Sequence, residues 1–148
     1  AISAGHSMRL TSAYRSYQEQ QEVYEGWVQY EMGFGKSRGQ AESDANSYSA
    51  LPGFSEHQLG TTADISSLDC IGIETVCASN ERFWNWLRDH AHEFGFVMSY
   101  PPRGESKTGY IHEPWHYRFI GVELAKEYKE KYEGKSYPAE FLRNKKLY

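Results

Sequence analysis

The sequence predicts one α+β domain with a central, largely antiparallel sheet flanked by helices. The expected strands and helices do not alternate strictly along the chain, as they would in a parallel α/β fold, and two of the strands follow one another directly. The length of 148 residues is that of a single domain, 1–148, which can bury about two thirds of its unfolded surface. We therefore expect no second domain.

The N-terminal part is expected to form a strand and two helices. Residues 9–14 read as a short strand, and Ser16 and Glu19 then fit a capping box at the start of a helix. A second helix, rich in small and polar residues, is expected over 38–48. Apolar residues continue the first helix at helical spacing until Gly33, namely Val23, Tyr24, Trp27 and Val28.

The C-terminal part is expected to form three strands and two helices. A strand over 60–67 is followed by a helix over 80–94 that ends before a glycine. Strands over 96–100 and 109–119 flank the loop PPRGESKTG like a hairpin, and a last helix is expected over 122–132. The helix over 80–94 is predicted from four apolar residues at helical spacing: Phe83, Leu87, Ala91 and Phe94.

Charge and composition exclude some partners. Lys and Arg number 16 against 20 Asp and Glu, giving a net charge of −4 with no basic block, so neither nucleic acid nor a membrane surface is expected. No apolar run approaches the roughly 20 residues that cross a bilayer. The chain starts at Ala1 without Met, so we expect a mature form or an excised piece, and an N-terminal anchor would lie upstream. The aromatic content of 16% suits either a core or a cleft for an extended ligand.

The two cysteines, Cys70 and Cys77, lie in one short segment, DCIGIETVC. A turn could bring them together as a small disulfide loop, which we predict in preference to two buried free thiols. A structural zinc site is not expected here, because a lone cysteine pair lacks further Cys or His partners.

The stretch YIHEPWHYRF, residues 110–119, contains the H-E-x-x-H pattern of helical zinc peptidases. That motif needs an uninterrupted helix, but Pro114 would remove a backbone N–H and clash within it, and the flanking residues favour a strand. We therefore do not predict the helical motif. A bulge at Pro114-Trp115 would let Glu113 and His116 point into one cleft, and His112 would not be needed.

A second group of polar residues lies in SEHQLGTTADI, residues 55–65. A loop carrying His57 can turn at Gly60 into a strand carrying Asp64, so that an imidazole and a carboxylate converge. Three such ligands with one open position are typical of catalytic zinc, which makes His57, Asp64 and His116 candidate ligands. A hydrogen-bonded His–Asp pair without metal is the alternative. Surface or core roles are expected for His90 and His92. No role is assigned to His6.

Together, AYRSYQEQQ, SEHQLGTTADI and GYIHEPWHYRFIG resemble the D-alanyl-D-alanine carboxypeptidase family of the VanY and LdcB type, zinc peptidases that trim peptidoglycan stem peptides. The resemblance covers about residues 10–121, and the combination of S-x-H-x-x-G-x-x-x-D with E-P-W-H in this order is specific. It implies the small α+β fold shared with the hedgehog signalling domain, with zinc on the face of the antiparallel sheet.

The resemblance also implies roles for individual residues. Glu113 would be the catalytic base. Arg15 matches the arginine that contacts the substrate carboxylate or the developing oxyanion, whereas the residues alone would favour a surface salt bridge. One Zn²⁺ per chain would be held by His57, Asp64 and His116.

Other positions concern the walls of the cleft. Gln20 and Ser55 match positions expected to line the substrate cleft, and Trp115 is expected to shape its wall. Ser99 stands where a basic residue often occurs in the family. Because a positive charge near the cleft would be missing, this serine leaves the substrate preference in question.

The resemblance implies a D,D-carboxypeptidase that releases the terminal D-Ala of a peptidoglycan stem peptide. An L,D-carboxypeptidase or a wall endopeptidase would share the metal and the base and stays open. A non-catalytic zinc-containing wall-binding module is the third alternative, disfavoured because Glu113 accompanies a complete ligand set. We expect a monomer in an extracytoplasmic, bacterial location, in the cell envelope or secreted.

Overall fold

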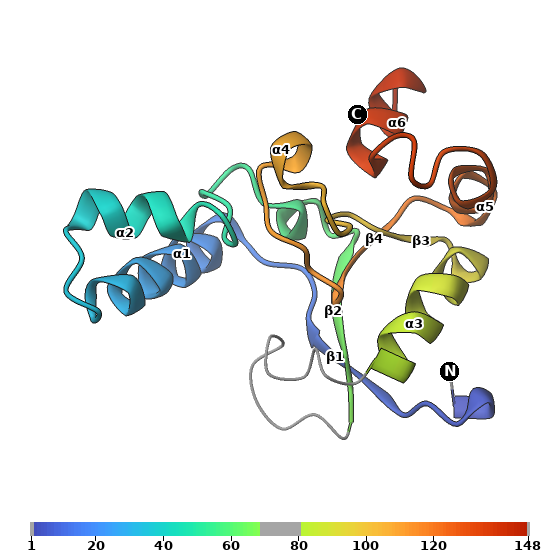
Figure 1. Ribbon diagram of the computed structural model, residues 1–148, viewed down its shortest axis with the longest axis horizontal. Helices are drawn as coiled ribbons and strands as arrows, with labels where there is room; N and C mark the ends of the chain where they lie inside the picture. The colour runs from blue at the N-terminus through green and yellow to red at the C-terminus, as the bar shows by residue number, and fades with distance from the viewer. Residues whose placement is uncertain (1, 69–80, 148) are drawn as a thin grey trace.

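A four-stranded antiparallel sheet forms the centre of the computed structural model, which describes residues 2–68 and 81–147 (Figure 1). The strand order is β1-β2-β4-β3, and each neighbouring pair is antiparallel. The predicted α+β class is confirmed. The strands are β1 (Met8–Ser12), β2 (Thr62–Ser67), β3 (Phe96–Met98) and β4 (His116–Phe119).

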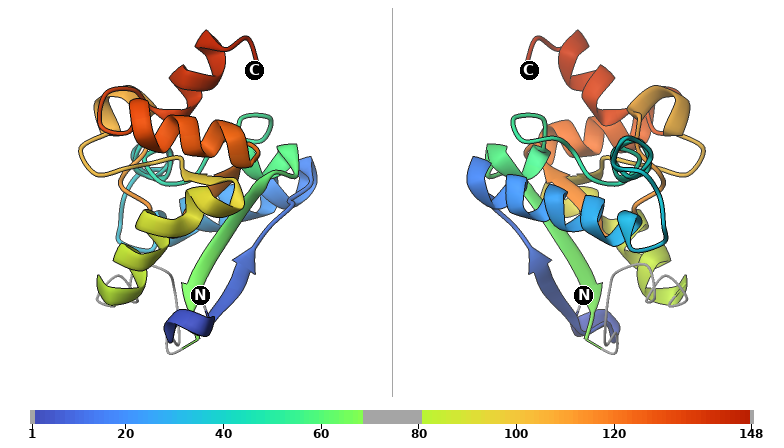
Figure 2. Two further views of the ribbon diagram at one scale, coloured as in Figure 1. Left: turned by 90° about the vertical axis from the view of Figure 1, so that its right-hand side faces the viewer. Right: turned by 90° about the vertical axis from the view of Figure 1, so that its left-hand side faces the viewer.

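Helices lie at both ends of this sheet. Two of them form a hairpin that projects from one end, whereas three others gather at the opposite end (Figure 1). The side views show α3 and α5 in front of the sheet from one side and α1 in front of it from the other (Figure 2). The projecting hairpin consists of α1 (Tyr17–Met32) and α2 (Arg38–Ala45), and the opposite group of α3 (Glu81–His90), α5 (Val122–Lys131) and α6 (Pro138–Asn144). Shorter turns are η1 (Ile2–Ala4), η2 (Glu56–Leu59), η4 (Ala91–Phe94) and α4 (Glu105–Thr108).

The two faces of the sheet are occupied differently. Side chains alternate between faces along a strand, so neighbouring residues of β4 point in opposite directions. Tyr117 packs with Phe83 and Leu87 of α3 in a buried apolar cluster. Its neighbour His116 faces the other way and lies opposite Asp64 of β2. One face of the sheet therefore stabilises the fold and the other presents polar groups.

The α1–α2 hairpin has its own small core. Tyr24 and Val28 of α1 bury against Ala41 and Ala45 of α2. The predicted capping box is present, since Ser16 Oγ accepts the backbone N–H of Glu19 and the Glu19 carboxylate accepts that of Ser16. The cap fixes the start of α1 directly after the segment that carries Arg15.

The predicted strand over 109–119 is wrong in its first part, because β4 begins only at His116. Pro114 has no N–H to donate to a neighbouring strand. The chain instead makes a turn, in which the N–H of His116 donates to the carbonyl oxygen of Glu113 at 3.2 Å. The N–H of Glu113 donates to the carbonyl oxygen of Tyr100 at 3.1 Å. The predicted bulge at Pro114-Trp115 is thus a turn ahead of the strand. The bulge that does occur lies in β1, between Leu10 and Ser12.

Two helices were not predicted. The short α4 lies inside the loop between β3 and β4, and α6 follows α5 with Pro138 in its first turn. The other predicted elements are present with shorter bounds, and the end of the helix predicted over 80–94 is the separate turn η4. The predicted Cys70–Cys77 disulfide lies outside the described residues.

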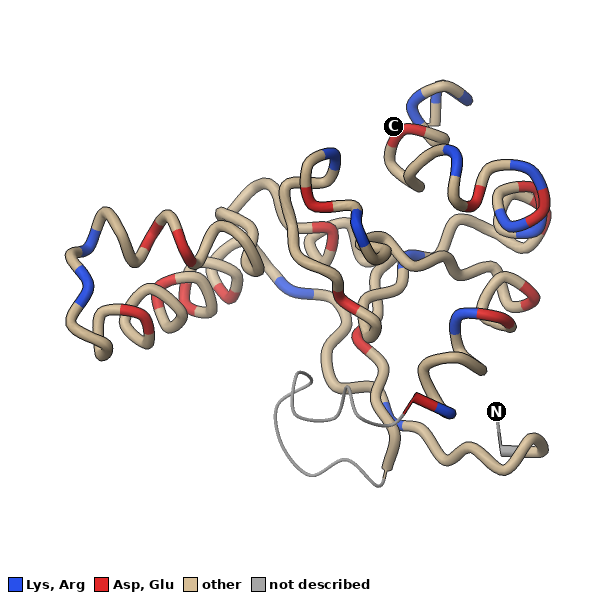
Figure 3. Tube along the Cα trace, viewed as in Figure 1, with Lys and Arg blue, Asp and Glu red and all other residues tan. Residues whose placement is uncertain are grey.

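Charges of both signs are interspersed along the described chain (Figure 3). On the helices they form surface ion pairs, for example Arg38 with Glu25 and Glu42, and Lys129 with Glu133. Over residues 2–68 and 81–147, none of the helices has the length and apolar character that a membrane span requires.

Candidate metal centre

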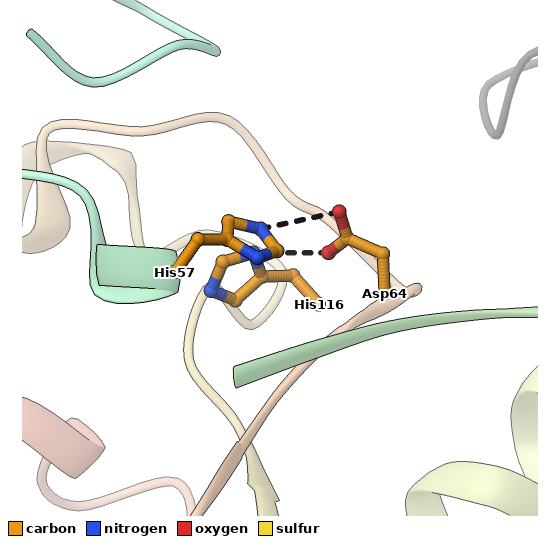
Figure 4. Close-up of side chains that lie close together, drawn as sticks. All are labelled: His57, Asp64 and His116. Carbon is orange, nitrogen blue, oxygen red and sulfur yellow. Dashed lines mark ion pairs between the residues drawn. The ribbon is translucent and has the colours of Figure 1, made fainter. Parts of the chain in front are cut away.

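Three buried side chains converge on the polar face of the sheet: His57 from η2, Asp64 from β2 and His116 from β4 (Figure 4). Their nearest donor atoms all lie within 4.8 Å of one another. Asp64 and His116 are cross-strand partners, so their side chains share one face. Gly60 ends η2 with a φ of 71°, a left-handed conformation that glycine adopts readily, and this turn carries the chain from His57 into β2.

Each imidazole turns one nitrogen to Asp64 and the other to a fixed partner. His57 Nε2 lies 3.2 Å from Asp64 Oδ2, and its Nδ1 lies 2.7 Å from the carbonyl oxygen of Ala13. His116 Nδ1 lies 3.3 Å from Asp64 Oδ1, and its Nε2 lies 3.1 Å from Glu56 Oε2. Metal-ligating histidines show this arrangement, in which the outer N–H is held and the inner nitrogen faces the metal.

The set fits a zinc ion. Asp64 Oδ1 is buried and has no hydrogen-bond partner among the described residues, although His116 Nδ1 lies 3.3 Å away as an ion-pair neighbour. A buried carboxylate oxygen without a hydrogen bond is costly unless another group satisfies it. Two imidazole nitrogens and one carboxylate are also the donor types of catalytic zinc sites. A zinc ion would be held by His57 Nε2, Asp64 and His116 Nδ1.

In the metal-free group the imidazoles and carboxylates shift one another's pKa values. Burial by itself lowers the pKa of His116, but the neighbouring Asp64 and Glu56 carboxylates outweigh burial and raise this pKa to about 10. Burial raises the pKa of Asp64, but the neighbouring His116 and His57 imidazoles bring it to about 2. A metal ion held by Asp64 and His116 Nδ1 would take the place of the imidazole proton.

Glu113 lies beside this group. Its Oε2 is 3.4 Å from His116 Nδ1, and its side chain is buried. The turn from Glu113 to His116 brings both side chains to the same place, as the bulge was expected to do. His112 points elsewhere, with Nδ1 2.9 Å from the carbonyl oxygen of Tyr100, and is not part of the metal-competent group. The H-E-x-x-H pattern is therefore not a helical zinc motif, as predicted.

A cavity of about 400 Å³ opens from the metal-competent group towards α1. Arg15, Gln20, Ser55 and Trp115, the residues that the family resemblance places at a substrate cleft, all line it. Aromatic rings form much of the remaining wall: Trp27, Tyr30, Tyr48, Tyr100 and Tyr110. Aromatic residues also pack in the core. The high aromatic content therefore serves both the core and the cavity wall.

Arg15 is held at this cavity by neutral groups. Its two terminal nitrogens donate to Gln20 Oε1 at 2.7 Å and to Ser12 Oγ at 3.0 Å. Gln20 is buried and donates its own N–H to the carbonyl of Ala50 at 2.6 Å, so both ends of its amide are engaged within the protein. Gln20 therefore orients Arg15. The neutral partners do not offset the charge that Arg15 brings to the cavity.

Sequence reasoning missed the groups behind His116. Glu56 Oε1 accepts from Arg118 at 3.0 Å, and Glu56 Oε2 accepts from Ser99 Oγ at 2.6 Å. Ser99 is buried, its hydroxyl donates to Glu56, and it is not among the residues that line the cavity. One signal was available: Arg118 follows His116 by two residues in a strand and so shares its face.

The remaining histidines lie apart from the metal-competent group of the described residues. His90 pairs with Glu93 at 2.8 Å and stacks on Trp86. His92 lines a separate cavity, and His6 contacts the rings of Phe83 and Trp86. The surface and core roles predicted for His90 and His92 agree with these positions.

Two imidazoles and a carboxylate at the end of a cleft, with a second carboxylate beside them, form a site of the kind used by mononuclear zinc hydrolases. The family model for VanY, D-alanyl-D-alanine carboxypeptidase, matches residues 1–122, and the chain belongs to this family. The family predicted from the motifs is confirmed.

Curated relatives agree with this membership. A D-alanyl-D-alanine carboxypeptidase of Enterococcus faecalis is 35% identical over 116 residues, which cover 78% of this chain and 41% of that protein. The putative carboxypeptidase YodJ of Bacillus subtilis is 35% identical over 127 residues, which cover 82% of this chain and 41% of that protein. The chain thus spans about two fifths of the length of these relatives.

Solved structures share the fold. VanYB in complex with D-alanine-D-alanine superposes with a TM-score of 0.82 and 32% identity over 97% of this chain and 74% of that one. A mutant of the D,D-pentapeptidase VanY in complex with Zn(II) superposes with a TM-score of 0.78 and 33% identity. The match covers 88% of this chain and 70% of that one. The LdcB LD-carboxypeptidase superposes with a TM-score of 0.75 and 29% identity. The match covers 96% of this chain and 61% of that one.

Proposed function

We propose that this chain is a zinc-dependent D-alanyl-D-alanine carboxypeptidase domain that removes the C-terminal D-amino acid from peptidoglycan stem peptides. The observation that carries the proposal is the convergence of His57, Asp64 and His116 at one end of a cavity, with the Glu113 carboxylate beside them. The Zn(II) complex of a VanY relative and the D-alanine-D-alanine complex of VanYB support the metal and the substrate class.

Hydrolysis of an amide needs an activated water and stabilisation of the negative oxygen that develops. A bound zinc ion supplies Lewis-acid chemistry, lowering the pKa of water and polarising a carbonyl. Glu113 would accept the proton of the attacking water and transfer it to the leaving amine. The turn that holds Glu113 next to His116 keeps the carboxylate within reach of that step.

Arg15 would recognise the anionic part of the substrate. Gln20 and Ser12 fix its guanidinium at the cavity wall, so little side-chain freedom has to be lost when a ligand binds. A guanidinium binds a carboxylate through two parallel hydrogen bonds or stabilises a developing oxyanion. Ser55 would contribute to the wall of the same cleft.

A second candidate is an L,D-carboxypeptidase that acts on the tetrapeptide, and the LdcB structure with a TM-score of 0.75 favours it. An endopeptidase would use the same metal and base. A wall-binding module without turnover is the alternative from another class, and the buried Glu113 beside the ligands argues against it.

Mass spectrometry of products from defined stem pentapeptide and tetrapeptide tests the proposal. The zinc-loaded protein is expected to release D-Ala from the pentapeptide, and Glu113→Ala to reduce the rate by about 10²- to 10⁴-fold with zinc content unchanged. Glu130→Ala, at an exposed position of α5, is the matched control. A Glu113→Ala protein with the wild-type rate would contradict the proposal, and cleavage of the tetrapeptide alone would support the L,D-candidate.

We also propose an extracytoplasmic location, in the cell envelope or secreted, because the assembled wall that carries stem peptides lies outside the cytoplasmic membrane. Fractionation of native cells is expected to recover the full-length protein with the envelope or the medium. Recovery with the cytoplasmic fraction would contradict this placement.

A further inference from the structure

Glu56 lies on the outer side of His116, away from the other candidate ligands. His116 Nδ1 faces Asp64 Oδ1 at 3.3 Å and Glu113 Oε2 at 3.4 Å, whereas Nε2 faces Glu56 Oε2 at 3.1 Å. The two ring nitrogens point to different sides of an imidazole. Glu56 therefore contacts the ligand His116 without facing the position of the metal, and it does not line the cavity.

The Glu56 carboxylate is itself held in place. Its Oε1 accepts from Arg118 Nη1 at 3.0 Å, and its Oε2 accepts from Ser99 Oγ at 2.6 Å. The side chains of Glu56 and Arg118 are each only 10% exposed. A buried carboxylate is tolerated when it is paired and its lone pairs are satisfied. The pair with Arg118 also adds no net charge behind the metal-competent group.

A carboxylate beside one ring nitrogen affects which nitrogen of a neutral imidazole carries the proton. A neutral imidazole has one N–H, and a hydrogen bond to a carboxylate keeps that proton on the nitrogen that donates it. With Nε2–H donating to Glu56, Nδ1 is the nitrogen left to bind a metal ion that Asp64 would also ligate. The carboxylate also makes the imidazole a stronger ligand.

We infer that Glu56 is a positioning residue that fixes the tautomer and ring orientation of His116 for zinc binding, with Arg118 and Ser99 holding its carboxylate. The inference rests on the zinc site of the proposed function. It assigns η2 two tasks, since Glu56 holds the imidazole of His116 while its neighbour His57 supplies a ligand. His57 itself is held by a backbone carbonyl, that of Ala13, so substitution at Glu56 acts on one of the two imidazoles.

Zinc affinity of Glu56→Gln tests the inference, measured by competition with a chromophoric chelator. The substitution keeps the size of the side chain and removes its charge, and it is expected to weaken zinc binding by about 10- to 100-fold. The visible absorption bands of the Co²⁺-substituted protein are expected to shift, because they report the ligand geometry. Glu93→Gln is the matched control, since Glu93 contacts His90 at 2.8 Å on the surface and is expected to leave both readouts unchanged.

Ser99→Ala keeps the inference falsifiable if Glu56→Gln does not fold, which thermal unfolding in chelator would reveal. It removes one hydrogen bond to Glu56 and is expected to weaken zinc binding in the same direction but less. Wild-type zinc affinity and Co²⁺ spectra in Glu56→Gln, or in Ser99→Ala where only that variant folds, would overturn the inference and leave the proposed function standing. A wild-type protein that binds no zinc would overturn both.

Discussion

Neighbouring residues of β4 serve different purposes on the two faces of the sheet. His116 faces Asp64 on the polar face, beside the cavity, whereas Tyr117 packs against Phe83 of α3 on the apolar face. Both side chains are buried. The apolar one is stabilised by packing and loss of water contact, and the polar one by specific charged partners.

The register between β2 and β4 determines both the packing of the apolar face and the approach of His116 to Asp64 on the polar face. A shift of one residue between β2 and β4 would turn Asp64 away from His116 and bring polar groups into the packed face. Packing against α3 therefore selects the register that assembles the metal-competent group. Substitutions on the apolar face should change stability without changing metal binding, and substitutions on the polar face should change metal binding first.

Phe83→Ala is the largest expected stability effect on the apolar face. Phe83 is 1% exposed, and loss of its ring leaves a cavity, so we expect a decrease of about 3–5 kcal/mol in the free energy of unfolding. Urea denaturation of the metal-free protein measures this. Zinc content per folded molecule is expected to stay at one, and a loss of zinc from folded Phe83→Ala would break the proposed separation of the faces.

The second largest expected effect on stability is that of zinc binding, on the polar face of the sheet. At a free concentration 100 times its Kd, a ligand that binds only the native state stabilises it by about 2.7 kcal/mol. We expect thermal unfolding to show this difference between zinc and chelator in the wild type and no difference in Asp64→Ala. Asp89→Ala, at an exposed position of α3, should keep the wild-type response. A zinc response that persists in Asp64→Ala would show that the metal binds elsewhere.

Ser16→Ala sharpens the comparison at the helix that covers the cavity. It removes the cap of α1 and is expected to cost about 1 kcal/mol in stability, measured by urea denaturation. Ser37→Ala, which removes the longer cap contact of α2 at 3.4 Å, is expected to cost less. If Ser16→Ala and Ser37→Ala lowered the free energy of unfolding equally, the lengths of the two cap contacts would not determine their contributions to stability.

Glu31→Gln is the smallest expected effect and tests the far end of the cavity. Hydrogen bonds from Lys36 and then Tyr48 lower the pKa of Glu31 below its ordinary value of 4.5. The ionised carboxylate therefore contributes stability above about pH 4.5, and this contribution is lost as the pH falls through the lower pKa of the folded state. We expect Glu31→Gln to unfold at a lower temperature than the wild type at pH 7 but not in acid. Glu22→Gln, at an exposed position of α1, should show no such pH dependence.

Part of this arrangement follows from the sequence. Hydrophobic periodicity and the Ser16 cap predicted α1, and Pro114 excluded a helix at the H-E-x-x-H pattern. The choice between a bulge and a turn could not be made, because both accommodate a residue without an N–H. For α6, the sequence signal is Pro138, because proline favours the first turn of a helix.

The metal-competent group was predictable from motifs, but its surroundings were not. Spacing and family resemblance together named His57, Asp64 and His116. The contact between Glu56 and His116 joins residues 60 apart in sequence, and only the paired strands and η2 bring them together. The contact of Ser99 with Glu56 could not be predicted for the same reason, since no local pattern shows that its hydroxyl faces Glu56.

The most direct test of the metal centre is anomalous diffraction at the zinc edge from a crystal of the zinc-loaded protein. We predict a single strong peak per chain, within bonding distance of His57 Nε2, an Asp64 carboxylate oxygen and His116 Nδ1, with Glu113 close by but not bound to the metal. A peak bound to His112, or the absence of a peak at His57, Asp64 and His116, would contradict the account.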